Sequence, residues 1–193
     1  LGGQIIGAGG GITKTGNGSL VLGNTANSFT GPVTVSGGLL KYGAANAIPV
    51  ANAVSVLSGG TLDLNGGGAT VTLASLAGDS STQGGLITTS ATSGTVTLTV
   101  GDANNTGFGG AITNNVGSAL NFVKVGTGNL TLGGPNSYSG STTINRGTIT
   151  LAASNSLPTS TAVTVNNTTA GETALLDLNG FNNSIASLTF GGT

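Results

Sequence analysis

The chain repeats itself with a period of about 110 residues, and no other feature constrains its fold as strongly. The segment from Ile12 to Pro49 recurs from Phe122 to Pro158 with one residue removed. Internal repeats of this kind are typical of proteins in which similar units stack and each unit contacts only its neighbours. We therefore expect a single elongated segment of about 1.75 copies, with copy one at about 1–108 and copy two at about 109–193.

Within each copy the apolar residues follow a period of two, which is typical of β-strands with one buried face. Val96, Leu98 and Val100, for example, alternate with three threonines. Gly, Asn, Asp and Ser bound these short runs and favour turns, and no stretch has a helical period. The pattern predicts an all-β fold. It also predicts that ten residues point into the interior: Leu20, Leu22, Leu62, Leu64, Val96, Leu98, Leu130, Leu132, Leu176 and Leu178.

Two all-β architectures, a sandwich and a solenoid of stacked coils, could satisfy this pattern. Aromatic residues make up only 4% of the chain and Trp is absent, whereas a two-sheet core is usually filled by large aromatics. A solenoid needs only a narrow stack of Val, Leu and Ile, and its coils can stack Asn and Thr in ladders. We therefore expect a β-solenoid of nine or ten coils, with roughly 20 residues per coil.

The repeated residues resemble a known family. Lys14 to Gly38 and its second copy, Lys124 to Gly147, resemble the autotransporter-associated β-strand repeat, also called the passenger-associated transport repeat. The DLNG runs and the later Ser-Leu pairs (Ser75-Leu76 and Ser187-Leu188) are similar to the segments that link such repeats. Arg146, where copy one has Gly37, is a small departure. The resemblance implies a right-handed parallel β-helix in the passenger region of a large exported bacterial surface protein.

The composition excludes several classes of function. Only 5% of the residues are charged, and the net charge is −1, so the chain cannot neutralise the phosphates of a nucleic acid. No run is apolar enough for a membrane helix and no signal-peptide pattern is present, so we expect neither nucleic-acid binding nor membrane insertion by this segment. Because the chain begins with Leu1 and both ends lie inside the repeat pattern, we expect a piece of a longer protein.

The acidic residues do not suggest an active site. A polysaccharide lyase or hydrolase on a β-helix needs clustered carboxylates and basic side chains. Asp63 and Asp177 occupy the same position in the two copies, which favours a repeated, exposed role in a turn. Asp79 and Asp102 lie in turn-forming sequences, and Glu172 lies in an insertion. We therefore predict no catalytic, cofactor-binding or metal-binding residues and no cofactor.

Three hypotheses remain for the function. The first is a non-catalytic, extracellular structural or adhesive segment of a bacterial surface or secreted protein, whose partners are further coils of the same chain or identical copies stacked end to end into a filament. The second is a carbohydrate-binding module, in which exposed Asn and Thr side chains and the aromatic pair Phe29 and Tyr138 form a weak glycan-binding groove. The third is a polysaccharide-processing enzyme. Lys14 and Lys124 lack the spacing of a phosphate-binding loop and are predicted to be exposed lysines that discourage wrong strand pairing.

Overall fold

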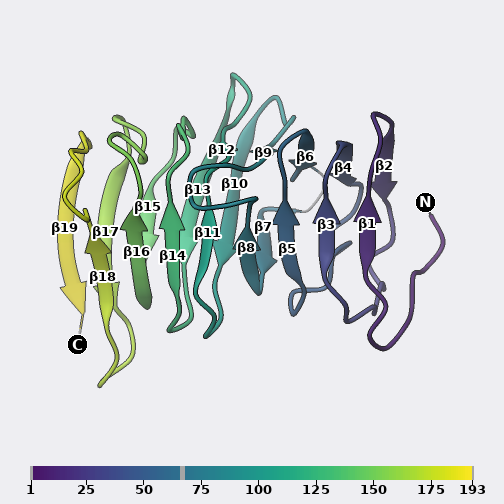
Figure 1. Ribbon diagram of the computed structural model, residues 1–193, viewed down its shortest axis with the longest axis horizontal. Helices are drawn as coiled ribbons and strands as arrows, with labels where there is room; N and C mark the ends of the chain where they lie inside the picture. Colours follow the sequence, from purple (N-terminus) through teal and green to yellow (C-terminus); the bar gives the residue numbers. More distant parts are fainter. Residues whose placement is uncertain (1, 66–67, 193) are drawn as a thin grey trace.

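The chain forms a parallel β-solenoid, shown by a computed structural model that describes residues 2–65 and 68–192 (Figure 1). No helix occurs among the described residues, and so none could cross a membrane. All pairs of named strands are parallel, which confirms the predicted all-β parallel β-helix. Gly66 and Gly67, which belong to the glycine-rich run after Asp63, lie outside the described residues.

The strands form four parallel sheets. The first contains β1 (Ile12–Lys14), β3 (Val33–Val35), β5 (Ala53–Val56) and β8 (Ser75–Ala77). The second contains β2 (Ser19–Leu22), β4 (Gly38–Tyr42), β6 (Gly60–Asp63), β9 (Leu86–Thr88) and β12 (Ala111–Ile112). The third contains β7 (Thr70–Leu73), β10 (Gly94–Val100), β13 (Ser118–Lys124), β15 (Thr142–Ile144), β17 (Ala162–Asn167) and β19 (Ser187–Gly192). The fourth contains β11 (Thr106–Phe108), β14 (Asn129–Leu132), β16 (Gly147–Leu151) and β18 (Ala174–Asp177).

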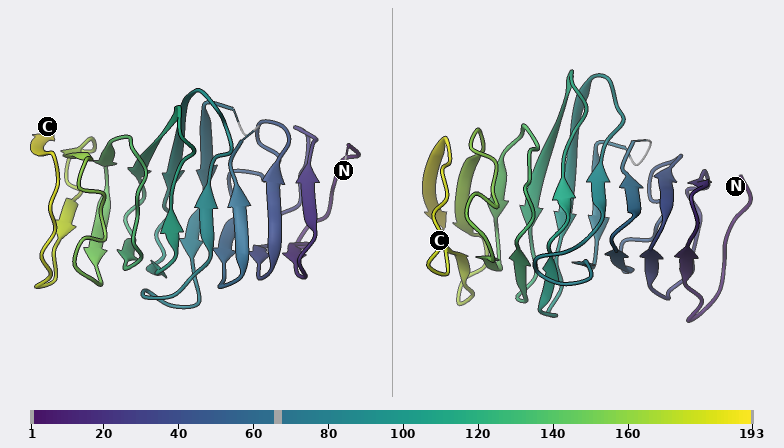
Figure 2. Two further views of the ribbon diagram at one scale, coloured as in Figure 1. Left: turned by 90° about the horizontal axis from the view of Figure 1, so that it is seen from above. Right: turned by 45° about the horizontal axis from the view of Figure 1, so that its top comes forward.

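The four sheets make three long faces, because β8 lies beside β11 and joins the first sheet to the fourth (Figure 1). The termini lie at opposite ends of the stack (Figure 2). Equivalent strands of the two copies do not share a face. Lys14 ends β1 on the face made by the first and fourth sheets, whereas its counterpart Lys124 ends β13 on the six-stranded face. The segment between the repeats, which adds β9 to β12, rotates copy two by one face relative to copy one.

The solenoid has about seven turns, so the expected nine or ten coils was an overestimate. The coils are longer and less regular than roughly 20 residues. Paired residues on successive coils are 19 positions apart between Asn129 and Thr148 but 27 apart between Gly147 and Ala174. The insertion around Asn167 to Thr173, which loops out between β17 and β18, accounts for the longer coil.

The interior is a stack of aliphatic side chains, as the period-two pattern predicts. Seven of the ten predicted interior residues are buried: Leu22, Leu62, Leu64, Val96, Leu98, Leu130 and Leu132. Leu20 and Leu176 are half-buried, and Leu178 is 45% exposed. All three lie in the first or last coil, where the neighbouring coil on one side is missing.

Buried asparagines connect successive coils in the loops that lie outside the named strands. Asn27 accepts a hydrogen bond from the backbone of Ile5 (2.7 Å) and donates one to the carbonyl of Ala47 (2.8 Å). Asn136, its counterpart in copy two, accepts from Ile112 (2.8 Å) and donates to Ser156 (2.6 Å). Each side chain thus replaces the backbone pairing that a strand would provide, which gives these asparagines a structural role in both copies.

Candidate functional site

Asp63 is the most strongly engaged carboxylate of the chain. It accepts hydrogen bonds from the backbone of Asn65 (2.9 Å) and from the backbone and hydroxyl of Ser90 (2.9 and 2.6 Å). Lys41 on the preceding coil lies 3.3 Å away. The contact with Asn65 is the predicted turn, but the predicted exposure is wrong, because the next coil covers Asp63 and leaves it buried. Asp63 therefore ties three successive coils together.

The other carboxylates are dispersed. Asp177 makes the same turn contact, with the backbone of Asn179 (2.8 Å), but no further coil lies over it. Asp102 forms a turn with Asn104, and Glu172 pairs with Arg146. Asp79 accepts two hydrogen bonds from Ser58, and these lower its pKa. Among the described residues, no three acidic groups come together as metal ligands.

The contacts of Asp63 predict an acid-sensitive contribution to stability. Burial acts to raise the pKa of Asp63, but hydrogen bonds from Ser90 and Asn65 and the charge of Lys41 outweigh it and lower the pKa from 3.8. A carboxylate with a lowered folded-state pKa stabilises the fold above its unfolded pKa and loses that contribution as the pH falls through its folded pKa. The contribution should thus be complete above about pH 5 and decline at lower pH.

Replacement of Asp63 by asparagine tests this contribution. We expect Asp63→Asn to be less stable than the wild type at pH 7 and to lose less further stability when the pH is lowered to 3, measured by urea unfolding at both values. Asp79 titrates in both proteins and so cancels in the comparison. Equal acid losses in the two proteins would show that Asp63 does not carry the effect.

The two repeated lysines fill a tight corner of the solenoid. The Nζ atom of Lys14 donates hydrogen bonds to the carbonyls of Thr15, Gly16 and Gly37, at 2.7 to 2.9 Å. Lys124 repeats the arrangement with the carbonyls of Val125, Gly126 and Arg146, at 2.5 to 3.4 Å. Two acceptors come from the turn after the lysine and the third from the next coil. Each lysine thus closes its own turn and joins it to the neighbouring coil.

The prediction that these lysines are exposed is wrong. Lys14 is 8% exposed and Lys124 only 1%, because each ends a strand at the position where the alternation points inward. Burial lowers the pKa of Lys124 to about 8, while Asp102 raises it and Arg146 lowers it further. At neutral pH the amine is still mostly protonated and can donate all three hydrogens. Neither lysine is available to bind a phosphate or to protect a strand edge.

Gly147, the first residue of β16, lies at the corner that Lys124 fills. Glycine is needed at this position for both its backbone conformation and its small size. Its φ is +71°, and an added Cβ would collide with the carbonyls of Gly126 and Gly128. Gly180 has a similar φ of +79° but no atom within 4 Å of the added carbon. We expect Gly180→Ala to cost about 1 kcal/mol from backbone strain alone and Gly147→Ala to cost clearly more, measured by chemical unfolding. Equal losses would mean that the corner can relax.

The aromatic pair proposed for a glycan groove is buried. Phe29 is 2% exposed and Tyr138 is 0% exposed. The Tyr138 hydroxyl lies 2.6 Å from Thr142 Oγ1, and its ring packs 6.1 Å from that of Phe122. Burial raises the pKa of Tyr138. The expectation that these rings form a carbohydrate-binding surface is therefore wrong, and they serve instead to fill the core.

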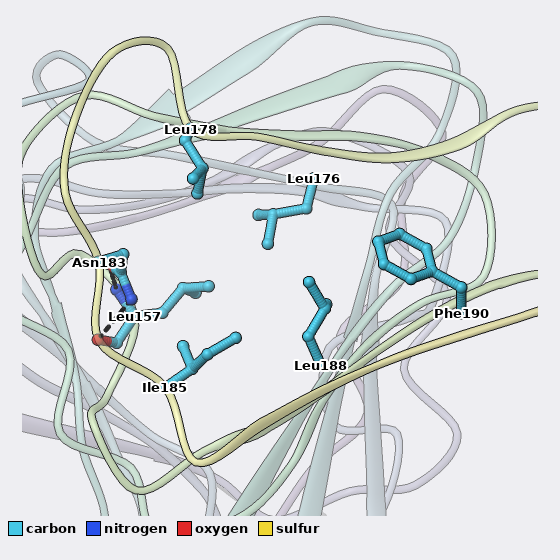
Figure 3. Close-up of a pocket in the computed structure, with 7 residues that line it drawn as sticks. All are labelled: Leu157, Leu176, Leu178, Asn183, Ile185, Leu188 and Phe190. Carbon is cyan, nitrogen blue, oxygen red and sulfur yellow. Dashed lines mark hydrogen bonds between the residues drawn. The ribbon is translucent and has the colours of Figure 1, made fainter.

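The last coil leaves an apolar hollow at the C-terminal end of the solenoid. The hollow has a volume of about 260 Å³, and its side chains converge on a common space (Figure 3). Leu188 and Phe190 on β19 remain 45% and 75% exposed. The lining residues are Leu157, Leu176, Leu178, Asn183, Ile185, Leu188 and Phe190.

The equivalent residues of copy one show what normally covers such a coil. Leu62, Leu64 and Leu76 match Leu176, Leu178 and Leu188, and all three are completely buried. They are covered because β9 pairs with β6, β10 pairs with β7 and β11 lies beside β8. The same apolar coil is thus a closed core layer in copy one and an open end in copy two.

These features define a parallel β-solenoid built from sequence repeats, each of which has a buried lysine at a corner. A comparison with protein-family models identifies the type of repeat. The model of the passenger-associated-transport-repeat matches residues 12–41 and 122–155, and these segments contain both corner lysines. The chain therefore carries two segments that match the passenger-associated transport repeat. Comparisons with curated proteins and with solved structures found no match.

Proposed function

We propose that this chain is a non-catalytic, extracellular structural segment of a bacterial surface or secreted protein. The observation that supports this most directly is the continuous stack of coils that contains both passenger repeats. The passenger family is generally structural, and such repeats are typical of secreted or surface proteins. The polar groups with the most contacts, Asp63 and the two corner lysines, are used to join coils, which suits a rigid spacer better than an enzyme.

An adhesive role is the second part of the proposal. On the six-stranded face, register places Thr72, Thr99, Val123, Thr143, Thr164 and Thr189 in one outward column. Five of these six residues carry hydroxyl groups, which can hydrogen-bond to a polar surface such as a cell-surface glycan. Binding of the purified chain to glycan-coated beads, compared with uncoated beads, tests this role.

The location is tested on cells that produce the full-length protein. Antibodies against this segment should label intact cells, and external protease should remove the label. A cytoplasmic protein detected in the same cells serves as the control for membrane integrity and should survive the protease. Labelling that needs permeabilised cells would contradict the extracellular part of the proposal.

A further inference from the structure

The face made by the first and fourth sheets is interrupted in the middle of the solenoid, where these two sheets meet. β8 and β11 lie side by side there, but they belong to different sheets, and no ladder joins these two described strands. The N–H of Gly78, directly after β8, donates a hydrogen bond to the carbonyl of Gly107 on β11 (2.8 Å). On the other two faces, regular ladders join the same pair of coils, between β7 and β10 and between β9 and β12.

The segment 78–83, which we call the strap, crosses this interruption on the outside of the solenoid. It follows β8, leaves the direction of the coils and runs along the stack across β11 (Figure 1). The Asp79 carboxylate accepts hydrogen bonds from the backbone and the hydroxyl of Ser58 on the preceding coil (2.6 and 2.7 Å). The carbonyl of Ser80 accepts one from the N–H of Gly109 on the following coil (3.0 Å). The strap is thus bonded to coils on both sides of the interruption.

Glycines beneath the strap allow its backbone to approach the coils closely. A Cβ atom at Gly109 would collide with the backbone of Thr82 and Gln83. One at Gly133, a further coil along the stack, would collide with the carbonyl of Ser81. A larger residue at either position would therefore push the strap outward. The strap rests directly on the two coils that lie beyond the interruption.

From these observations we propose that the interruption between β8 and β11 is a hinge of the solenoid and that the strap holds this hinge closed. Leu76 on β8 and Phe108 on β11 are completely buried, so the apolar core continues through the junction. On the outside, the strap supplies contacts that a ladder makes elsewhere. Parts of a fold with few backbone hydrogen bonds open most readily, so release of the strap lets the rod bend at this face. The inference rests on the proposed structural function and adds the point at which the rod flexes.

Pairs of spin labels measure this bend, because the chain contains no Cys and labels attach only to introduced cysteines. Labels at Thr34 and Thr150 lie five coils apart on the interrupted face. Labels at Thr72 and Thr189 also lie five coils apart, but on the six-stranded face, where continuous ladders bridge the same junction. With the strap in place, both distance distributions should be narrow when measured by pulsed electron paramagnetic resonance.

Two substitutions release the strap in different ways. Asp79→Ala removes its hydrogen bonds to Ser58, and Gly109→Ala places a methyl group beneath it. In both variants we expect the distance distribution on the interrupted face to shift to longer distances and to broaden, while the distribution on the six-stranded face stays unchanged. Gly18→Ala is the matched control for the glycine substitution, because no atom lies within 4 Å of the added carbon. It should alter neither distribution.

Ser58→Ala, which removes one of the two hydrogen bonds to Asp79, replaces either variant that fails to give the wild-type circular dichroism spectrum. An unchanged distribution on the interrupted face in the strap variants, or a broad one in the wild type, would overturn the proposal. Equal changes on both faces would also overturn it, because they would indicate a general loosening of the coils. These outcomes do not depend on the location of the protein on the cell, which the protease experiment tests separately.

Discussion

Leu132→Asp should destabilise the solenoid by about 4 kcal/mol or more. Leu132 is completely buried on β14 and is flanked on both sides by further coils. The substitution removes a large side chain from a close-packed stack and places a carboxylate there without a partner. Chemical unfolding monitored by circular dichroism measures the loss.

Thr131→Asp is the matched control for this experiment. Thr131 is the preceding residue of the same strand and points outward, so the new carboxylate remains in contact with water. The cost should be below about 1 kcal/mol, the range of ordinary surface substitutions. Similar losses in the two variants would show that β14 does not have the inward and outward faces described above.

Lys124→Met should cost about 3 kcal/mol of unfolding free energy, the second largest effect we expect. Methionine retains most of the length and volume of the lysine but donates no hydrogen bonds. The carbonyls of Val125, Gly126 and Arg146 would each lose the Nζ donor. Each buried acceptor that is left without a partner costs about 1 to 3 kcal/mol. Part of this cost is offset, because the substitution also removes the penalty of burying the charged amine.

Lys41→Met controls for the loss of a positive charge in general. Lys41 is about one-third exposed and its partner Asp63 is buried, but the hydrogen bonds from Ser90 and Asn65 still satisfy that carboxylate when Lys41 is replaced. We therefore expect a smaller loss of stability than at Lys124. The corner hypothesis requires a clearly larger loss for Lys124→Met than for Lys41→Met in the same unfolding assay. A Lys124→Met protein as stable as the wild type would mean that the corner does not need its lysine.

Much of the fold could be predicted from the sequence, because the signals for it are local. Alternation fixes which side of a strand faces the core, and Leu22, Leu62 and Leu132 are buried as it indicates. The recurrence of Lys14 to Gly38 at Lys124 to Gly147 predicts the type of repeat, and the family model matches both segments. The number of coils could not be obtained in this way, because loops such as 167–173 lengthen a coil without changing the pattern of its strands.

The role of the lysines was missed although a signal for it was present. In Ile12-Thr13-Lys14 and Phe122-Val123-Lys124 the alternation places the lysine inward, in phase with the apolar residue two positions earlier. The usual preference of lysine for the surface conflicts with this pattern, and the pattern was correct. The burial of Asp63 had no such local signal, because Ser90 reaches it from the next coil, 27 residues further along the chain.

The rotation of copy two by one face has a consequence for any longer array of these repeats. If each repeat turns the pattern by one of three faces, the same strand returns to the same side only after three repeats. Equivalent surface positions then follow a screw path around the rod. Such a rod presents every part of its repeat in every direction, so that any binding partner meets the same set of surfaces from whichever side it approaches.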